Sequence, residues 1–402
     1  DLMANIEYSI GELHNLFELE LRKSMSLNDK SVMHEVAVEN RDNILDNGNP
    51  VFNKYYKNMK PKVLLGHLNQ TGGNNDSSKW DLHELDGYDV IIDDGHIEAK
   101  SEYSNTSWNS KWSPKVLTPY TTRNNLSKYQ PYFKPTGRIS DFAVAHSTGI
   151  VGLKYPAKMQ KSTTIAYSDY YNDQDLTCVT VLIDVGKNSV VTLDEKFFNK
   201  DGLKVYKIIY LVRDYASLTI ERQFDIDGKD KGANIIESKV IQFPNSTFNY
   251  KVVGEGSKYT QDLMYIDVYK CCQTDVKGSF DLYGDYVNNS VVDVHHIGPD
   301  STSRVDIRSI IDDQSHSSFL GSIIVDKEAE GTDAELVNKN LLVSNTASAI
   351  TEPQLDIHTK EIACSHGCTV SNIDENQLYF LESRGIETNI AEETLKQCFL
   401  KM

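Results

Sequence analysis

The chain has 402 residues, of which 39% are hydrophobic and 25% charged, the composition of an ordinary folded protein with room for two or three structural units. A net charge of −17 excludes the broad positive surface of a nucleic-acid-binding protein and argues against an anionic membrane as a partner. No apolar run is long enough to cross a bilayer, and six cysteines are too few for a disulfide framework. We therefore expect a reducing compartment, the cytoplasm, with an organelle such as a plastid left open.

The first region, residues 1–85, is predicted to be helical. Ile6, Ile10, Leu13 and Phe17 recur at spacings of three and four residues, which places them on one face of a helix. The helical pattern weakens after residue 40, and the glycine- and asparagine-rich stretch at 66–79 is typical of a mobile loop.

The second region, residues 86–370, is predicted to be all β. Short runs rich in Val, Ile, Tyr and Thr follow one another, separated by turn signals at Asp201-Gly202, Asp227-Gly228 and Asn288-Asn289. No helical period interrupts them over roughly 200 residues, which argues against alternating βαβ units. A sandwich or barrel and a solenoid both fit this pattern. Because no clear sequence repeat is visible, the pattern alone favours the sandwich.

The third region, residues 371–402, is predicted to form a hairpin of two helices. Asn372 with Glu375 and Asn389 with Glu392 resemble capping boxes, and Gly385 stands where a helix terminator belongs. One stripe of the second helix faces either the core of the protein or a partner; its residues are Ala391, Leu395, Cys398, Phe399 and Met402.

Candidate metal ligands concentrate in the segment Cys364-Ser365-His366-Gly367-Cys368. In an extended chain the three ligand side chains share a face, with neighbours about 7 Å apart and the two cysteines roughly 13 Å apart. Neighbouring pairs can share one ion, and a bend at Gly367 would gather all three. A closed tetrahedral site needs four ligands, so the missing one would come from elsewhere, for instance from another chain. The alternative is a structural role, with buried cysteines and a hydrogen-bonded histidine.

Other residues offer weaker signals. His295 and His296 are adjacent on an expected strand and face opposite ways, which predicts a structural or surface role. His358 precedes the cysteine and histidine segment on a neighbouring strand and could approach it. The chain contains no GxxxxGK[ST] phosphate loop, HExxH zinc motif or GxSxG elbow. Two alternative functions stay open, namely a carbohydrate-active β-solenoid enzyme that uses paired carboxylates and a structural zinc protein.

From Val291 to its end, the sequence closely resembles the SufD family of the SUF system, which assembles iron–sulfur clusters. The matching segments are Ser303-Arg304, Phe319 to Gly321, Asn340 to Ser344, Pro353 to Ile357, Cys364 to Thr369 and Leu378 to Ile386. Cys368 replaces the alanine of the family's CSHGAT motif, so this thiol is not a family feature. Gly367 stands where the paralogous SufB has a glutamate, which favours SufD.

The resemblance implies a mainly β fold, a right-handed parallel β-helix flanked by α-helical N- and C-terminal domains. It implies a non-catalytic scaffold that pairs with a SufB-like subunit through the β-helix and depends indirectly on a cysteine desulfurase. A transient iron–sulfur cluster would bind at that interface, with His366 as the main ligand, Cys364 as a lesser one and Cys368 as a further metal candidate. The chain would bind no nucleotide of its own, would pair with itself in isolation, and has no residues that decide whether it binds reduced flavin.

The resemblance also implies that a SufC ATPase binds the C-terminal helical hairpin. The residues expected to make this contact are Leu378, Phe380, Leu381, Arg384, Leu395 and Phe399.

Overall fold

The fold is taken from a computed structural model. It describes residues 87–93, 96–100, 114–117, 129, 132, 150–168, 176–199, 202–224, 232–254 and 259–401. The predicted helical region at residues 1–85 lies outside the described residues. No described helix is long and apolar enough to cross a membrane.

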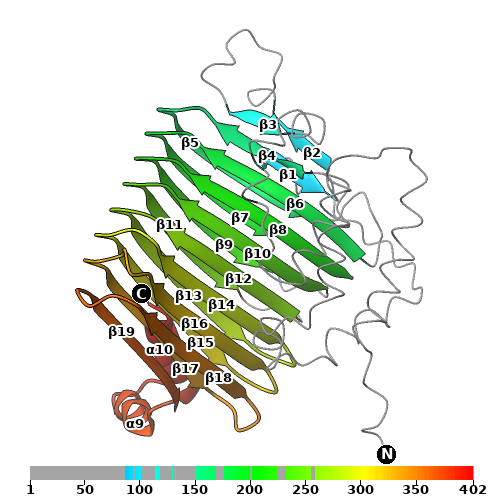
Figure 1. The fold of residues 1–402 in the computed structure, drawn as a ribbon. Helices are drawn as coiled ribbons and strands as arrows, with labels where there is room; N and C mark the ends of the chain where they lie inside the picture. The colour runs from blue at the N-terminus through cyan, green and yellow to red at the C-terminus, as the bar shows by residue number, and fades with distance from the viewer. Residues whose placement is uncertain are drawn as a thin grey trace, which may run out of the picture.

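The strands form two sheets, and the chain alternates between them as it coils (Figure 1). Pairing is parallel except at the start, where β1 pairs with β2 and β3 with β4 in antiparallel fashion. The chain is therefore a parallel β-solenoid, which confirms the mainly β fold; its right-handed winding stays a prediction.

Sheet A contains β2 (His96–Ala99), β1 (Val90–Asp93), β5 (Gln160–Ser168), β7 (Val190–Phe197), β9 (Ser217–Phe224), β11 (Thr247–Gly254), β13 (Gln273–Leu282), β15 (Thr302–Ile311), β17 (Asp333–Leu342) and β19 (Ala363–Asn372). Sheet B contains β3 (Lys115–Leu117), β4 (Ile150–Tyr155), β6 (Leu176–Val185), β8 (Leu203–Val212), β10 (Ala233–Gln242), β12 (Tyr259–Val268), β14 (Val287–His296), β16 (His316–Val325) and β18 (Ser348–Ile357).

The length of each turn explains why the sequence shows no clear repeat. One register position of sheet A is occupied in successive turns by Ser217, Thr247, Gln273, Thr302, Asp333 and Ala363. Each of these turns is therefore 26 to 31 residues long. The irregular spacing blurs the period, and the sandwich favoured by the pattern alone is wrong.

Along the sheet A strands, side chains alternate between the buried interior of the coil and its outer face, whereas the sheet B strands, such as β8, are buried on both faces. On β17, Ala334, Leu336, Asn338 and Asn340 are buried, and the residues between them are partly or fully exposed. Stacking in register places each inward residue on its counterpart in the next turn. A continuous, mainly aliphatic core results along the axis of the coil.

One ion network interrupts this apolar core. The guanidinium of Arg222, fully buried on β9, donates to Glu195 at 2.9 Å and to Asp262 at 2.8 Å. Tyr210 also donates to Glu195, at 2.6 Å, and Tyr250 to Asp262 at 2.5 Å. A charge that is buried without a partner destabilises the fold, so these charged side chains must meet in the core. The network therefore constrains which turns can stack here.

The predicted turn at Asn288-Asn289 is wrong. Both residues lie inside β14 and are buried, at 2% and 5% exposure. The Nδ2 of Asn289 donates to the hydroxyl of Tyr259, the start of the neighbouring strand, at 3.2 Å. A hydrogen bond between turns thus satisfies the Asn289 amide, which would otherwise favour a loop.

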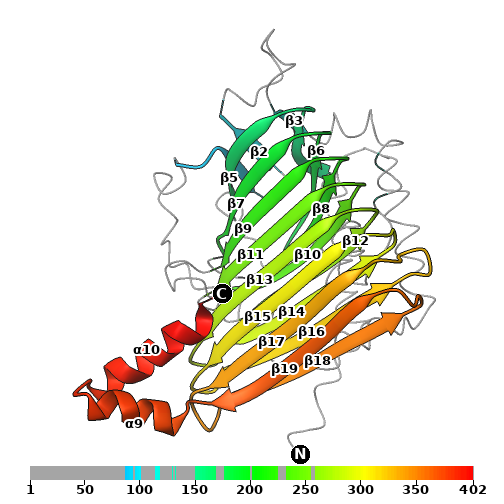
Figure 2. The same cartoon turned by 90° about the vertical axis from the view of Figure 1, so that its left-hand side faces the viewer.

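The C-terminal hairpin is confirmed, with α9 (Glu375–Ser383) and α10 (Thr388–Leu400). Both predicted capping boxes are wrong: the side chain of Asp374 caps α9 through the Asn376 N–H, and α10 begins after Glu387 without a side-chain cap. Gly385, at φ +85°, follows the last turn of α9 and ends the helix as predicted. Figure 2 shows the hairpin beside sheet A, near the end of the coil where β18 and β19 lie.

Candidate functional site

The predicted ligand segment lies on β19, the outermost strand of sheet A. In the β17 to β19 register, Cys364 pairs with Ala334, His366 with Leu336 and Cys368 with Asn338. Those partners on β17 are buried in the coil interior. Parallel strands in register point paired side chains the same way, so all three ligand candidates point into the coil.

These inward side chains are nevertheless accessible, because β18 and β19 are the last strands of their sheets. His366 is exposed, Cys364 and Cys368 are half-buried, and Val370 on the same face is 45% exposed. On the opposite strand, Ile357 is 38% exposed. We call the inward faces of β18 and β19 the open end. It presents apolar and ligand side chains that every earlier turn would bury.

The ligand candidates are spread along a straight strand rather than gathered. Along β19 the Cα atoms of His366 and either cysteine are about 7 Å apart, and those of the two cysteines about 13 Å. Within the described part of the chain, no three His, Cys, Asp or Glu side chains form a group able to hold a metal ion. Burial, reinforced by the nearby Asp333 carboxylate and opposed by the Ala334 backbone, raises the pKa of the Cys364 thiol.

Among the described strands, only β17 pairs with β19, so one side of the β19 backbone has no strand partner there. Ala363 donates its N–H to the carbonyl of Thr332 on the preceding turn at 2.9 Å. In a parallel sheet, successive residues of a strand direct their backbone N–H and C=O groups alternately to the strands on either side. The backbone groups of His366 and the other inward residues of β19 therefore face the edge that does not pair with β17. No charged residue or proline occurs in β19, whereas β18 carries Glu352, Pro353 and Asp356. Charges and proline protect edge strands, so β19 is the unprotected edge.

The other histidines have structural surroundings. His296 is fully buried, with its Nε2 2.9 Å from the Ser303 hydroxyl. His295 faces outward, with its Nε2 3.0 Å from Asp326, so the predicted opposite orientation is confirmed. His358 follows β18 and lies 3.2 Å from the Asp356 carboxylate.

A second candidate surface lies on the hairpin. Phe380 is 56% exposed and carries the Arg384 guanidinium 5.2 Å from its ring centre. Tyr379 and Ile390, which sequence reasoning missed, are 72% and 54% exposed. The sequence around Tyr379 gave no sign of this exposure, because α9 is too short to show a clear apolar stripe. The remaining predicted contact residues are half-buried: Leu378, Leu381, Leu395 and Phe399.

The hairpin is fixed to sheet A through α10. Arg308 on β15 donates to the main-chain carbonyls of Phe399, at 3.0 Å, and Lys401. Lys396 lies 3.6 Å from Asp312, and Ala391 is fully buried. Cys398 is exposed, so the solenoid does not cover this part of the predicted stripe.

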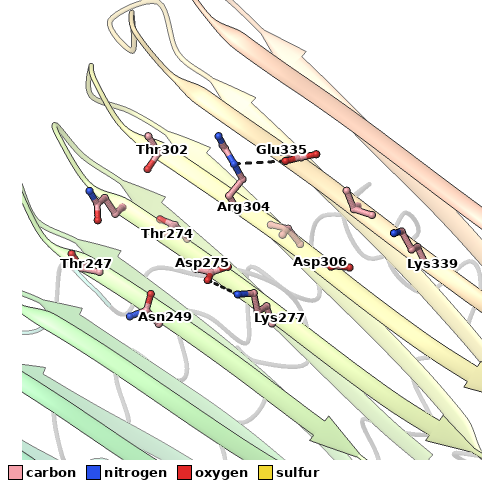
Figure 3. A pocket seen from close by; sticks show the side chains of 13 residues that line it. Thr247, Asn249, Thr274, Asp275, Lys277, Thr302, Arg304, Asp306, Glu335 and Lys339 are labelled. Carbon is pink, nitrogen blue, oxygen red and sulfur yellow. Dashed lines mark ion pairs between the residues drawn. The ribbon is translucent and has the colours of Figure 1, made fainter. Parts of the chain in front are cut away.

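A shallow groove of about 660 Å³ crosses the outer face of β11, β13, β15 and β17 (Figure 3). Its three carboxylates all lie near basic groups. Asp275 is 3.0 Å from Lys277, Glu335 is 3.7 Å from Arg304, and Asp306 pairs with Arg308 at 2.7 Å. None of the described residues that line the groove is aromatic. This arrangement lacks both the free acid and the stacking surface that a sugar-cleaving site would use.

Comparison with known families bears on both the coil and the hairpin. A model of the family described as "SUF system FeS cluster assembly, SufBD core domain" matches residues 170–399, more than half of the chain. The chain belongs to the SufB/SufD family. The matched range includes the open end and nearly all of the hairpin of this SufB/SufD-family chain.

Individual relatives agree with the family assignment. The chain is 38% identical over 92 residues to the iron–sulfur cluster assembly protein SufD of Escherichia coli, covering 23% of this chain and 22% of that protein. The Plasmodium falciparum SufD protein is 24% identical over 254 residues, 61% of this chain and 17% of that protein. The chloroplastic protein ABCI7 of Arabidopsis thaliana is 31% identical over 121 residues, 28% of this chain and 25% of that protein. The chain thus spans about a fifth of the length of these relatives.

Proposed function

We propose that this SufB/SufD-family chain is a scaffold subunit on which a nascent iron–sulfur cluster is held between the open end and a SufB-like partner. The observation that carries this proposal is the position of His366, an inward ligand candidate that is exposed because no described strand stacks on the outer side of β19. The cluster is cargo rather than a resident cofactor. His366 supplies one ligand, Cys364 and Cys368 are the candidates for a second, and the partner completes the coordination that one strand cannot.

The partner docks by continuing the coil. Its edge strand adds to β19, whose free backbone groups and lack of charge favour strand addition. Val370 and Ile357 then become buried, which supplies the apolar area that an interface core needs. Without the partner, a second copy of the chain uses the same edge, giving the homodimer expected in isolation.

A SufC-type ATPase docks on the hairpin, where Phe380 and Tyr379 are the exposed anchors. The chain itself has no phosphate loop, so nucleotide chemistry belongs to that partner. Arg308 connects α10 to β15, and β15, β17 and β19 are successive strands of sheet A. Motion of the ATPase therefore reaches the ligand strand β19 through β15 and β17.

For the source of sulfur, the role of flavin and the cellular compartment, we propose what the resemblance to the SufD family implies. A cysteine desulfurase supplies sulfur through the partner, and the role of reduced flavin stays undecided. The chain works in the cytoplasm or, like its relative named as chloroplastic, in a plastid.

Co-purification with SufB-like and SufC-like partners tests the proposal. After anaerobic supply of ferrous iron and a desulfurase, the complex should contain iron and acid-labile sulfide in similar amounts. A chain that stays alone in the presence of both partners, or a complex that accumulates no sulfide, contradicts the proposed function.

A further inference from the structure

We propose that Cys368, together with His366, forms the nitrogen–sulfur ligand pair of the open end, and that Cys364 is the lesser ligand of the three. The inference rests on the proposed function, because it assigns ligands at the site where the cargo would bind. The pair takes divalent metals that accept both imidazole and thiolate, such as Fe²⁺, Co²⁺ and Zn²⁺.

The geometry of β19 makes His366 and Cys368 natural partners. They are two residues apart on one strand, so both side chains leave the same face with Cα atoms about 7 Å apart. Metal bonds of about 2.0 Å to nitrogen and 2.3 Å to sulfur, added to the side-chain lengths, bridge that spacing. The open end faces solvent or a docked partner, which leaves the remaining coordination positions free for sulfide and the partner's groups.

Cys364 has the same spacing from His366 but different surroundings. It packs against the apolar core of the coil, and its thiol contacts the backbone of Ala334. Turning this thiol toward a metal beside His366 would give up both contacts. The two cysteines, about 13 Å apart, cannot share one ion, so His366 must pair with one or the other.

Cys368 carries neither of these constraints. Among the described residues its thiol makes no hydrogen bond, and it is not part of the packed apolar cluster. In register beneath it lies Asn338, whose Nδ2 donates to the Ile307 carbonyl and whose Oδ1 accepts from Asn340. Cys368 therefore lies next to the hydrogen-bonded amide of Asn338, and its sulfur can turn toward His366 without breaking a hydrogen bond among the described residues.

Cobalt binding to the full chain tests this pairing, because a thiolate bound to Co²⁺ gives a charge-transfer absorption band in the near ultraviolet. The chain is titrated anaerobically with Co²⁺ alone, and far-ultraviolet circular dichroism verifies the fold of each variant. We expect the band in the unmodified chain, its loss in Cys368→Ala and His366→Ala, and a smaller decrease in Cys364→Ala. Cys398→Ser, which removes the exposed thiol of α10, is the matched control and should leave the band intact.

Three outcomes overturn the inference: no band in the unmodified chain, a band that survives Cys368→Ala, or a larger loss in Cys364→Ala than in Cys368→Ala. Failure of the proposed function looks different. In that case the cobalt band depends on Cys368 as expected, but the complex with SufB-like and SufC-like partners accumulates no iron and sulfide.

Discussion

Arg308 on β15 donates a hydrogen bond of 3.0 Å to the main-chain carbonyl of Phe399, 91 residues later in the chain. The same guanidinium donates to the carbonyl of Lys401 and is held by Asp306. A cation at the C-terminus of a helix satisfies carbonyls that have no partner within the helix and interacts favourably with the helix dipole. This side chain therefore helps to fix the position of α10 on the solenoid, together with the Lys396–Asp312 ion pair and the buried Ala391.

Replacing Arg308 by Ala should loosen the hairpin without unfolding the coil. Hydrogen bonds to a charged group are worth about 1.5–3 kcal/mol, so amides of α10 should exchange with solvent roughly ten- to a hundredfold faster. Hydrogen exchange read by mass spectrometry measures this change. Arg304→Ala, on the same strand but bonded only to surface groups of β15 and β17, is the control. Equal exchange in both variants would show that Arg308 does not hold the hairpin.

His366→Ala should prevent cluster accumulation on the complex while leaving its assembly intact. The side chain is exposed, so its loss leaves no cavity in the core. Iron, sulfide and visible absorption of the co-purified complex measure the effect. His358→Ala removes another exposed histidine and should behave like the unmodified chain. Normal cluster content in the His366 variant removes this residue from the proposed mechanism.

Val370→Lys should weaken binding of the SufB-like partner at least about tenfold, because a buried unpaired charge is costly at an interface core. The measurement is a dissociation constant from calorimetry or light scattering. Val190→Lys is a matched control, since Val190 is similarly exposed, at 50% against 45%, but lies on β7 away from the open end. If both variants bind equally well, the open end is not the interface.

Phe380→Ala should lower the affinity for the SufC-type ATPase by about tenfold or more, as is common for an exposed aromatic anchor. Tyr283, 40% exposed on the loop between β13 and β14, gives the matched aromatic control Tyr283→Ala. Pull-down with the isolated ATPase, followed by its ATP hydrolysis rate in the complex, reads the effect. Unchanged binding would place the ATPase on another surface.

Sequence reasoning works where a physical signal is local. The alternation along β19 correctly places Cys364, His366 and Cys368 on one face, because strand geometry alone decides it. The αα-hairpin and its terminator Gly385 are likewise local features. Exposure of His366 is not local, since it depends on β19 being the last strand of its sheet.

Other features depend on contacts between turns and are hidden from single-sequence reasoning. Asn289 predicts a turn in isolation, yet its amide is satisfied by Tyr259 on the neighbouring turn. Charged residue types are rarely buried, yet Arg222 and Glu195 form a fully buried ion pair. The solenoid itself is concealed because its turns vary in length, so that equivalent positions never recur at a fixed spacing.

His296 should make stability depend on pH. Burial, with a smaller contribution from His295, lowers the pKa of His296 to about 4, and its Nδ1 has no hydrogen-bond partner among the described residues. The folded chain thus keeps this imidazole neutral, whereas the unfolded chain protonates it below an ordinary pKa of about 6.5. The stabilising contribution is therefore complete above pH 6.5 and is lost as the pH falls from 6.5 toward 4, by about 2 kcal/mol between pH 7 and 5.

The variant His296→Val separates this effect from the titration of other groups. In register, His296 stacks between Val268 and Val325, so valine continues an apolar column already present in the coil. Urea unfolding at pH 7 and pH 5 should show a smaller decrease in stability for this variant than for the unmodified chain. His358→Val, at an exposed position, should leave the decrease unchanged. The same loss in the His296 variant would mean that other groups cause the acid sensitivity.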